Sequence, residues 1–314
     1  MCKTLRILRA LVSMAIGRRA ARKPGLPALS PRYYYTVWIR HLCLAHQNGL
    51  PVVPRVIVEL GPGGALGMAA AAMLCGVETY TALDALPLAS LPASIEILHG
   101  VEQLLQARAG IPDDTEFPRV RPRLNSYSFP HNILTDEHLK IALSPERVRR
   151  IEQCIRQPDG TRRGNESVRY LAPWRGPDPI QEASVNAVLT QAVMEYVPDL
   201  AAAYRAMWRW LEPGGWMSHT IDVSSHGTAD AWDGHWAYSD WQWRLLHGRA
   251  VVPINRRPYS DHRAFILDAG FRVICESATQ QAAMTPQGKL AQEFGSLTAY
   301  DRQTSGCTVQ AVKP

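Results

Sequence analysis

The segment VIVELGPGGALG, residues 56–67, decides the fold of this chain. Its β-branched residues Val56 to Val58 lead to the acidic Glu59, and a run of glycines then opens into the alanine-rich segment 67–76. This order predicts a buried strand, a tight glycine loop and the start of a helix. In such a turn the glycines let the backbone approach a ligand, and the N–H groups at the helix start face it. The segment therefore predicts a nucleotide-binding site at the end of the strand.

The spacing of the glycines separates two kinds of nucleotide loop. A dinucleotide fingerprint needs a third glycine at position 66, where the chain has Leu66. With Glu59, Gly61 and Gly63 in place, the loop is instead similar to the ExGxGxG pattern of S-adenosylmethionine (SAM) methyltransferases. Ala65 takes the position of the third glycine of that pattern.

Length and composition indicate a globular protein. The 314 residues can bury one large core with inserted segments, and 46% hydrophobic and 20% charged residues are ordinary values. The six cysteines form no CxxC pair and show no pairing rhythm. They predict free thiols in a reducing, cytoplasmic environment and no zinc site.

The net charge of +6 is concentrated at the N-terminus, where ten Lys and Arg precede Glu59 without a single acidic residue. We therefore divide the chain into a basic leader, residues 1–30, and a single domain, residues 31–314. Because the excess charge lies mostly in the leader, it does not indicate a nucleic-acid partner. Residues 1–23 have two interpretations: a basic amphipathic helix on the inner membrane surface, or a loosely docked N-terminal helix.

A helix is predicted over residues 30–49, with Ser30 as its cap and Gly49 at its end. Its aromatic residues either pack in the core or, as Tyr33 or Tyr35, reach a substrate. The next apolar run ends at Asp84, about 25 residues after Glu59. An acidic side chain at the tip of the second strand suits the binding of ribose hydroxyls.

Residues 90–167 form an insertion that is longer than a strand–helix–strand unit needs. Helices are predicted over residues 94–108 and at the basic segment 144–157. Several arginines of the insertion could meet phosphate or carboxylate groups, although a solvated charged face is the alternative. These arginines are Arg119, Arg121, Arg123, Arg149 and Arg150.

A third strand leads to Trp174, and a fourth, residues 185–190, is followed by Gln191 to Tyr196. Ligands bind at the carboxyl ends of strands in open α/β sheets, so these residues are site candidates. A helix begins near Pro198 or Asp199 and is stopped by the Pro-Gly-Gly turn at 213–215, directly before a strand at 216–221.

Read in order, the segments VELGPGGALG, TALD, AVLTQAVMEYV and LEPGGWMSHTID resemble a class I SAM-dependent methyltransferase over residues 52–222. Some details resemble bacterial small-molecule or glycan-pathway enzymes. The resemblance implies an α/β fold with a Rossmann-like, seven-stranded, mostly parallel sheet, helices on both faces and an antiparallel last strand. Cap segments would be inserted at about 90–167 and 223–257, and the cofactor would be S-adenosyl-L-methionine.

The resemblance also implies a role for individual residues. Gly61 and Gly63 would lie by the methionine moiety, Glu59 would support its ammonium group, and Asp84 would hold the ribose. The loop with Trp174 would meet the adenine. Gln191, Ala192 and Val193 would line the floor beside the sulfonium. Glu195 would face the substrate or stabilise its loop.

Residues 223–257 are rich in aromatic residues and histidines, which predicts either a lid over the site or a packed helical cap. The spacing of His219, Asp222, His226 and His235 matches no usual set of metal ligands, so no metal is predicted. The C-terminal part is predicted as a helix at 260–270, capped by Ser260, and two final strands.

Methyl transfer to a hydroxyl group needs positioning and a base. His219 is the leading candidate for that base, with Glu195 and His226 in reserve, and a structural role for His219 is the alternative. The predicted function is methyl transfer to a small-molecule or glycan-precursor acceptor, most readily at oxygen. The competing interpretations are a non-catalytic partner protein with the same fold and a dinucleotide-dependent oxidoreductase.

Overall fold

The computed structural model describes residues 29–174, 179–247 and 252–314, so nearly all of the predicted basic leader lies outside the described residues. Its centre is a seven-stranded sheet in the order β3-β2-β1-β4-β5-β7-β6. The strands are β1 (Val56–Leu60), β2 (Thr79–Leu83), β3 (Ser167–Leu171), β4 (Val185–Gln191), β5 (Leu211–Asp222), β6 (Arg272–Gln280) and β7 (Thr304–Val312).

The five strands from β3 to β5 in this order are parallel, whereas β7 runs antiparallel to both β5 and β6. This arrangement confirms the predicted mostly parallel sheet with an antiparallel last strand. Since parallel strands end at the same edge, the segments that follow β1, β2 and β4 come together there.

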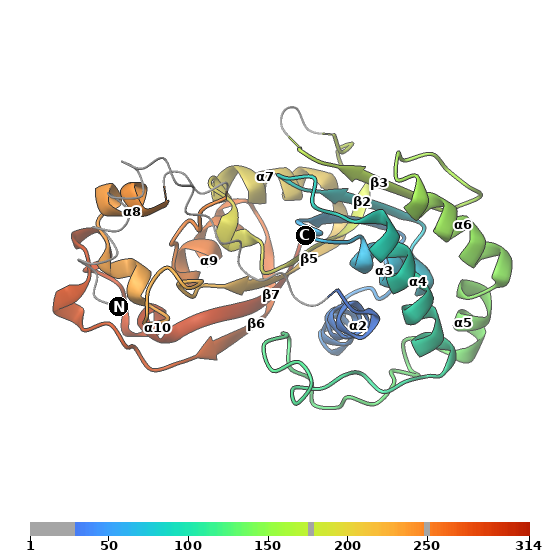
Figure 1. Ribbon diagram of the computed structural model, residues 1–314, viewed down its shortest axis with the longest axis horizontal. Helices are drawn as coiled ribbons and strands as arrows, with labels where there is room; N and C mark the ends of the chain where they lie inside the picture. Colours follow the sequence, from blue (N-terminus) through green and yellow to red (C-terminus); the bar gives the residue numbers. More distant parts are fainter. Residues whose placement is uncertain (1–28, 175–178, 248–251) are drawn as a thin grey trace.

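Helices cover both faces of the sheet (Figure 1). The helices are α2 (Pro31–Gln47), α3 (Gly67–Leu74), α4 (Leu91–Gln106), α5 (Asp136–Ala142), α6 (Pro145–Arg156), α7 (Leu200–Trp210), α8 (Asp240–His247), α9 (Tyr259–Asp268) and α10 (Ala299–Gln303). Helices α2, α3, α4 and α6 contribute to one core cluster, and α7 and α9 to a second on the other face.

Three local features differ from the sequence-based prediction. Helix α7 ends at Trp210, and β5 begins at Leu211, because Leu211 already pairs with Val185 ahead of the Pro-Gly-Gly segment. Helix α9 starts at Tyr259, and the Ser260 hydroxyl donates to Asp301 rather than capping the helix. The short helix α5 was not predicted at all.

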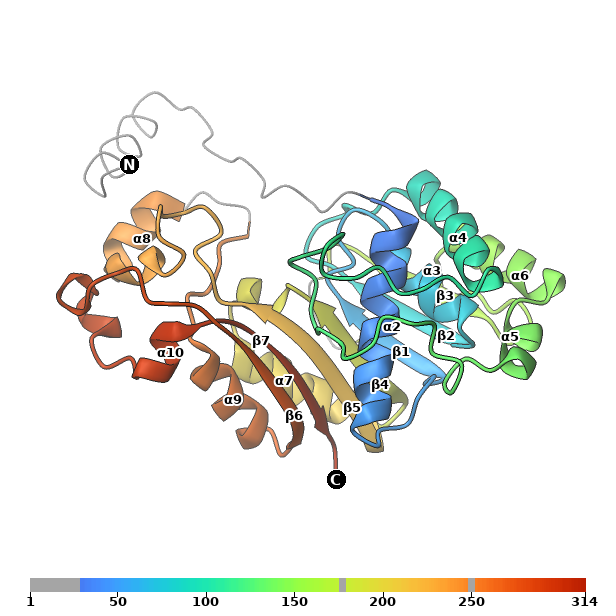
Figure 2. The same ribbon diagram turned by 90° about the horizontal axis from the view of Figure 1, so that it is seen from below.

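The long strands β5, β6 and β7 extend beyond the parallel part of the sheet towards the segment that carries α8 and α10 (Figure 2). Trp236 of this segment is fully buried, and its ring lies against those of Trp232 and Phe294. None of the helices in the described ranges is long and apolar enough to cross a membrane.

Candidate active site

The glycine loop after β1 is shaped by backbone conformations that favour glycine. Gly61 and Gly63 have φ angles of +71° and +68°. The Gly61 N–H donates to the carbonyl of Leu83 at 2.8 Å, which ties the loop to β2. A Cβ atom on Gly61 would lie 2.5 Å from Cγ2 of Val193, so the loop after β4 leaves no room for a side chain here.

Asp84 follows β2 and fastens this loop. Its Oδ2 accepts a hydrogen bond from the Gly63 N–H at 3.2 Å, and its Oδ1 accepts one from Leu86 at 3.1 Å. Burial raises the pKa of the Asp84 carboxyl, against the opposing effect of these N–H donors. The sequence-predicted ribose residue thus lies directly against the glycine loop.

Glu59 is buried on the face of the sheet that α2 and α3 cover. The Tyr80 hydroxyl donates to its Oε2 at 2.9 Å. Burial raises the pKa of Glu59 to about 8, and the charge of Asp84 acts in the same direction. The carboxyl is therefore largely protonated at neutral pH until a cation comes to lie beside it.

Trp174 closes the end of the site at the loop after β3. Its backbone N–H donates to the carbonyl of Asp84 at 2.7 Å, and its ring centroid lies 6.0 Å from that of Trp210. Its indole Nε1 is buried and makes no hydrogen bond to the described residues. A buried donor of this kind is suited to a ligand that brings an acceptor.

Gln191 and Ala192 lie where β4 ends. The Gln191 Oε1 atom is 3.1 Å from Nε2 of His41 on α2, and Nδ1 of His41 is 2.7 Å from the Ser218 Oγ. The Gln310 Nε2 in turn donates to Ser218 at 3.1 Å. Ala192 has a φ angle of +54°, a strained conformation for a residue with a side chain, and its N–H donates to the Thr220 carbonyl at 2.8 Å.

The hydrogen bonds of His41 define one neutral tautomer of its ring. Burial lowers the pKa of His41 to about 4, so the ring is neutral and carries one proton. Because Oε1 of Gln191 can only accept, Nε2 carries that proton, and Nδ1 accepts from the Ser218 hydroxyl.

Glu195 is a buried carboxyl without a hydrogen-bond partner on either oxygen among the described residues. Its Oε1 lies 3.8 Å from Nε2 of His226, and that nitrogen is 3.6 Å from Oδ2 of Asp222. The other nitrogen of His226 is 3.0 Å from the Tyr196 hydroxyl. Burial raises the pKa of Glu195 well above its ordinary value, so the site holds a carboxyl that binds a proton tightly.

His219 points to the opposite face of the sheet from its neighbour Ser218. Its Nδ1 lies 2.9 Å from the Thr190 Oγ1, and its ring is 5.9 Å from that of Tyr204 on α7. The residue is fully buried, and burial lowers its pKa to about 3. A catalytic role of His219 stays a prediction, and these surroundings favour the structural alternative.

The aromatic residues of 223–257 mostly pack inside the cap. Trp232, Trp236 and Trp243 are buried, whereas Trp241 is 63% exposed. The Trp236 Nε1 donates to the Arg256 carbonyl at 2.9 Å, which closes the cap on itself. Within the described residues, no group of three His, Cys, Asp or Glu side chains has the geometry to hold a metal ion.

Two inward-facing residues of α2 were not among the predicted site residues. Arg40 and His41 are both fully buried on α2, although the sequence pattern predicts only the aromatic and apolar residues of this helix to face inward. The signal was present as two adjacent basic residues within an otherwise apolar and aromatic segment. Such residues are buried only when they have partners.

Comparison with known proteins finds a methyltransferase model that matches part of the chain, and solved structures of similar fold. A family model described as "Methyltransferase domain" matches residues 138–218. No curated protein matches the sequence. The chain is similar to a solved SAM-dependent methyltransferase from Mesorhizobium loti, with 15% identity, a TM-score of 0.41, and coverage of 86% of this chain and 96% of that chain.

A second similar structure is a putative methyltransferase from Bacillus halodurans, with 14% identity, a TM-score of 0.41, and coverage of 87% of this chain and 97% of that chain. The matched segment, the sheet order and the positive φ angles of the glycine loop agree with the Rossmann-like methyltransferase fold that the sequence resembles. The residues beside the glycine loop fit S-adenosylmethionine, because the carboxyl groups of Glu59 and Asp84 lie at the ends of β1 and β2, and Asp84 accepts a hydrogen bond from Gly63 of the loop.

Proposed function

We propose that the enzyme methylates a hydroxyl oxygen of a small-molecule or glycan-precursor acceptor, with Glu195 as the proton acceptor. The observation that carries this proposal is the buried Glu195 carboxyl, which follows β4 and has no hydrogen-bond partner in the part of the chain that the structure describes. A buried polar group without a partner is costly in a folded protein and is typical of functional sites.

The bound cofactor supplies an activated methyl group, so the chain's own residues must orient the acceptor and remove its proton. Burial favours the protonated form of Glu195, so Glu195 acts as the base in the fraction of the enzyme in which it is ionised, and its raised pKa then makes it a stronger base than an ordinary carboxylate. Glu195 takes the hydroxyl proton at one of its oxygens. The proton then leaves Glu195 for solvent past His226, whose Nε2 lies 3.8 Å from Glu195 Oε1 and 3.6 Å from Oδ2 of Asp222, a side chain that is 43% exposed.

The cofactor would be held by the residues that surround the glycine loop. In this proposal Gly61 and Gly63 form its cradle, Asp84 accepts from the ribose hydroxyls, and Glu59 faces the ammonium group. The indole of Trp174 contacts the adenine, and Gln191 and Ala192 form the floor.

A membrane contact of residues 1–23 stays a prediction.

The test is a radiolabelled SAM assay on host extracts separated into lipid, glycan, small-metabolite, protein and nucleic-acid pools. We expect label in the glycan or small-metabolite pool. Label in protein or nucleic acid alone would exclude the proposed acceptor class. SAM binding by calorimetry without any labelled product would support a non-catalytic partner protein instead.

A pair of variants tests the base. Glu195→Gln keeps the shape of the side chain and removes its ability to accept a proton, so turnover should fall about a hundredfold or more. SAM affinity should stay within a few-fold of the wild type. The matched control is Glu182→Gln, which alters an exposed carboxyl in the segment before β4. Equal turnover in the two variants would remove Glu195 from the mechanism.

A further inference from the structure

We propose that the acceptor carries an anionic group, a carboxylate or a phosphate, and that Arg121 and Arg123 bind this group at the edge of the active site. The inference rests on the proposed function, because it names the chemical class of the acceptor of that same site.

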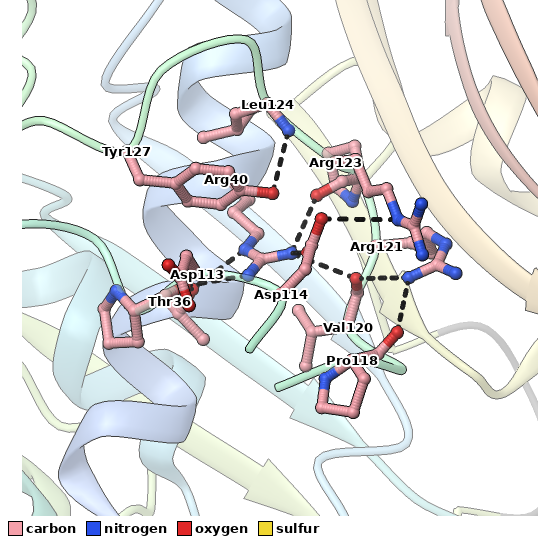
Figure 3. Close-up of polar contacts among 12 residues, drawn as sticks. Thr36, Arg40, Asp113, Asp114, Pro118, Val120, Arg121, Arg123, Leu124 and Tyr127 are labelled. Carbon is pink, nitrogen blue, oxygen red and sulfur yellow. Dashed lines mark hydrogen bonds and ion pairs between the residues drawn. The ribbon is translucent and has the colours of Figure 1, made fainter. Parts of the chain in front are cut away.

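The segment that carries both arginines is fixed to α2 by Arg40 (Figure 3). The fully buried Arg40 donates through Nη1 to Asp114 at 2.9 Å and to the carbonyls of Val120 and Pro122 at 3.0 and 3.2 Å. Its Nη2 donates to the carbonyl of Pro112 at 2.8 Å. The loop is therefore held in one position by a buried cation, which suits a binding loop.

Among the described residues, the hydrogen-bond partners of Arg121 are all uncharged. Its Nη1 donates to the carbonyls of Pro118 and Val120 at 2.9 and 3.0 Å, and its Nε donates to the Thr279 Oγ1 at 3.3 Å. Burial, and then the nearby charge of Arg123, lowers the pKa of Arg121. Its Nη2 makes no hydrogen bond within the described part of the chain, so this half-buried cation has room for an anion.

The positive charge around Arg121 exceeds the negative charge. Arg40 and Arg123 both pair with Asp114, and the Arg123 Nε lies 3.3 Å from Asp114 Oδ2. The neighbouring Asp113 uses one carboxylate oxygen for Thr115 and Glu116. Neither Nη atom of Arg123 makes a hydrogen bond to a described residue. An anion would therefore offset the repulsion between these cations.

The same segment contacts the floor of the active site. The backbone carbonyl of Arg121 accepts a hydrogen bond from the Thr220 Oγ1 at 3.4 Å. Thr220 is the residue that pairs with Gln191 across β4 and β5, and its carbonyl accepts from Ala192 at 2.8 Å. Thr220 therefore contacts both the segment that carries the arginines and the floor residues proposed for the cofactor.

The Nη2 of Arg121 and the two Nη atoms of Arg123, which make no hydrogen bond to the described residues, are donors that match the paired oxygens of a carboxylate or phosphate. An acceptor with such a group would be oriented by it, with its hydroxyl turned towards the methyl group and Glu195. A neutral acceptor would not offset the excess positive charge of Arg40, Arg121 and Arg123 and would be bound less tightly.

The first test separates the small-metabolite pool by anion exchange at pH 7 before the radiolabel assay. Label should enter the retained, anionic fraction. Arg121→Gln and Arg123→Gln should each raise the KM for that fraction about tenfold or more and leave SAM affinity unchanged. The matched control Arg119→Gln, an exposed arginine of the same loop, should leave KM unchanged.

Label in the unretained fraction, or the same KM in all three variants, would overturn the inference while leaving methyl transfer intact. If no pool accepts label, the proposed function fails, and inorganic phosphate then decides the inference alone. Phosphate at fixed ionic strength should raise the Tm of the wild type and Arg119→Gln but not of Arg123→Gln. An equal rise in all three, or none, would contradict the site.

Discussion

The Nε2 atom of His41 lies 3.1 Å from the Oε1 atom of Gln191, so the helix before the first strand is hydrogen-bonded to the end of the fourth strand. The bond is partly buried, and it continues through Ser218 to Gln310 on β7. Helix α2 therefore does more than cover the sheet, because it sets the side-chain position of a residue on the proposed cofactor floor.

Replacement of His41 by Ala should be strongly destabilising. It removes a buried ring, leaves the Ser218 hydroxyl proton without its acceptor and leaves the Gln191 Oε1 without its donor, which should cost about 3 kcal/mol of the free energy of unfolding. Urea denaturation measures this loss. The control His99→Ala, at an exposed position on α4, should stay within about 0.5 kcal/mol of wild type. An equal loss of the free energy of unfolding in His41→Ala and His99→Ala would show that the hydrogen bonds of His41 do not stabilise the fold.

Buried neutral histidines should make the protein sensitive to acid. Burial lowers the pKa of His41 to about 4 and that of His219, His235 and His262 to about 3. Between pH 6.5 and these values the unfolded chain binds more protons than the folded one. Their contribution to stability is therefore complete above pH 6.5 and is lost as the pH falls.

His235→Leu tests this pH dependence cleanly, because neither ring nitrogen of His235 makes a hydrogen bond to a described residue. The variant should lose less stability on acidification than the wild type, by about 1.4 kcal/mol per pH unit below the unfolded pKa. Urea midpoints at pH 7, 6 and 5 measure the slope. Identical slopes would mean that His235 titrates alike in both states.

Alanine substitutions at Gly61 and Gly214 distinguish the cost of backbone strain from the cost of a steric clash. Both have a positive φ angle, but a Cβ on Gly214 would meet nothing within 4 Å, whereas one on Gly61 would meet Val193. Gly214→Ala should cost about 1 kcal/mol from backbone strain alone. Gly61→Ala should cost more and should weaken SAM binding, as measured by calorimetry.

The double variant Gly61→Ala/Val193→Ala removes the side chain that meets the new Cβ. It should recover part of the free energy of unfolding that Gly61→Ala loses. The loss that remains should be close to the backbone strain measured in Gly214→Ala. If the second substitution recovers nothing, contact between the loops after β1 and β4 is not what excludes a side chain at Gly61.

The sheet and the glycine loop could be predicted because their determinants are local. The apolar run at 56–58, the glycines after it and the acidic tip at Asp84 follow one another in sequence, and the structure has β1, α3 and β2 there. The predicted end of α7 was wrong by a few residues. Pairing of Leu211 with Val185 on β4, which local sequence does not reveal, ends the helix earlier.

The roles of Arg40 and His219 depend on residues far away in the sequence. Arg40 is satisfied by the carbonyl of Pro122, 82 positions later, so its burial could not be inferred from α2 alone. On β5, helices cover both faces, so alternation cannot tell which of Ser218 and His219 faces α2. The contact of Ser218 with His41 on α2 and the packing of Tyr204 against His219 decide it.

Glu59 should release a proton when SAM binds. Its pKa is raised to about 8 in the protein alone, so the carboxyl is mostly neutral at pH 6 to 7. An ammonium group beside it would favour the ionised form, and affinity should tighten by up to about tenfold per pH unit over this range.

Calorimetry in two buffers of different ionisation enthalpy counts the protons that Glu59 releases. The wild type should release close to one proton per SAM at pH 6.5, and Glu59→Gln should release close to none. The same proton count in both proteins would place the ammonium group away from Glu59.

His219→Asn distinguishes a structural histidine from a base. Asparagine can keep a hydrogen bond to Thr190 but cannot fill the volume beside Tyr204, so the free energy of unfolding should fall by about 1–3 kcal/mol. Turnover measured well below the Tm should stay within a few-fold of wild type, since the ring lies on the α7 face and its pKa is held near 3. Thr190→Val, which removes the other end of the same hydrogen bond, is the matched control and should behave similarly. A hundredfold loss of turnover in His219→Asn alone, with SAM affinity unchanged, would instead make His219 the base and Glu195 a structural carboxyl.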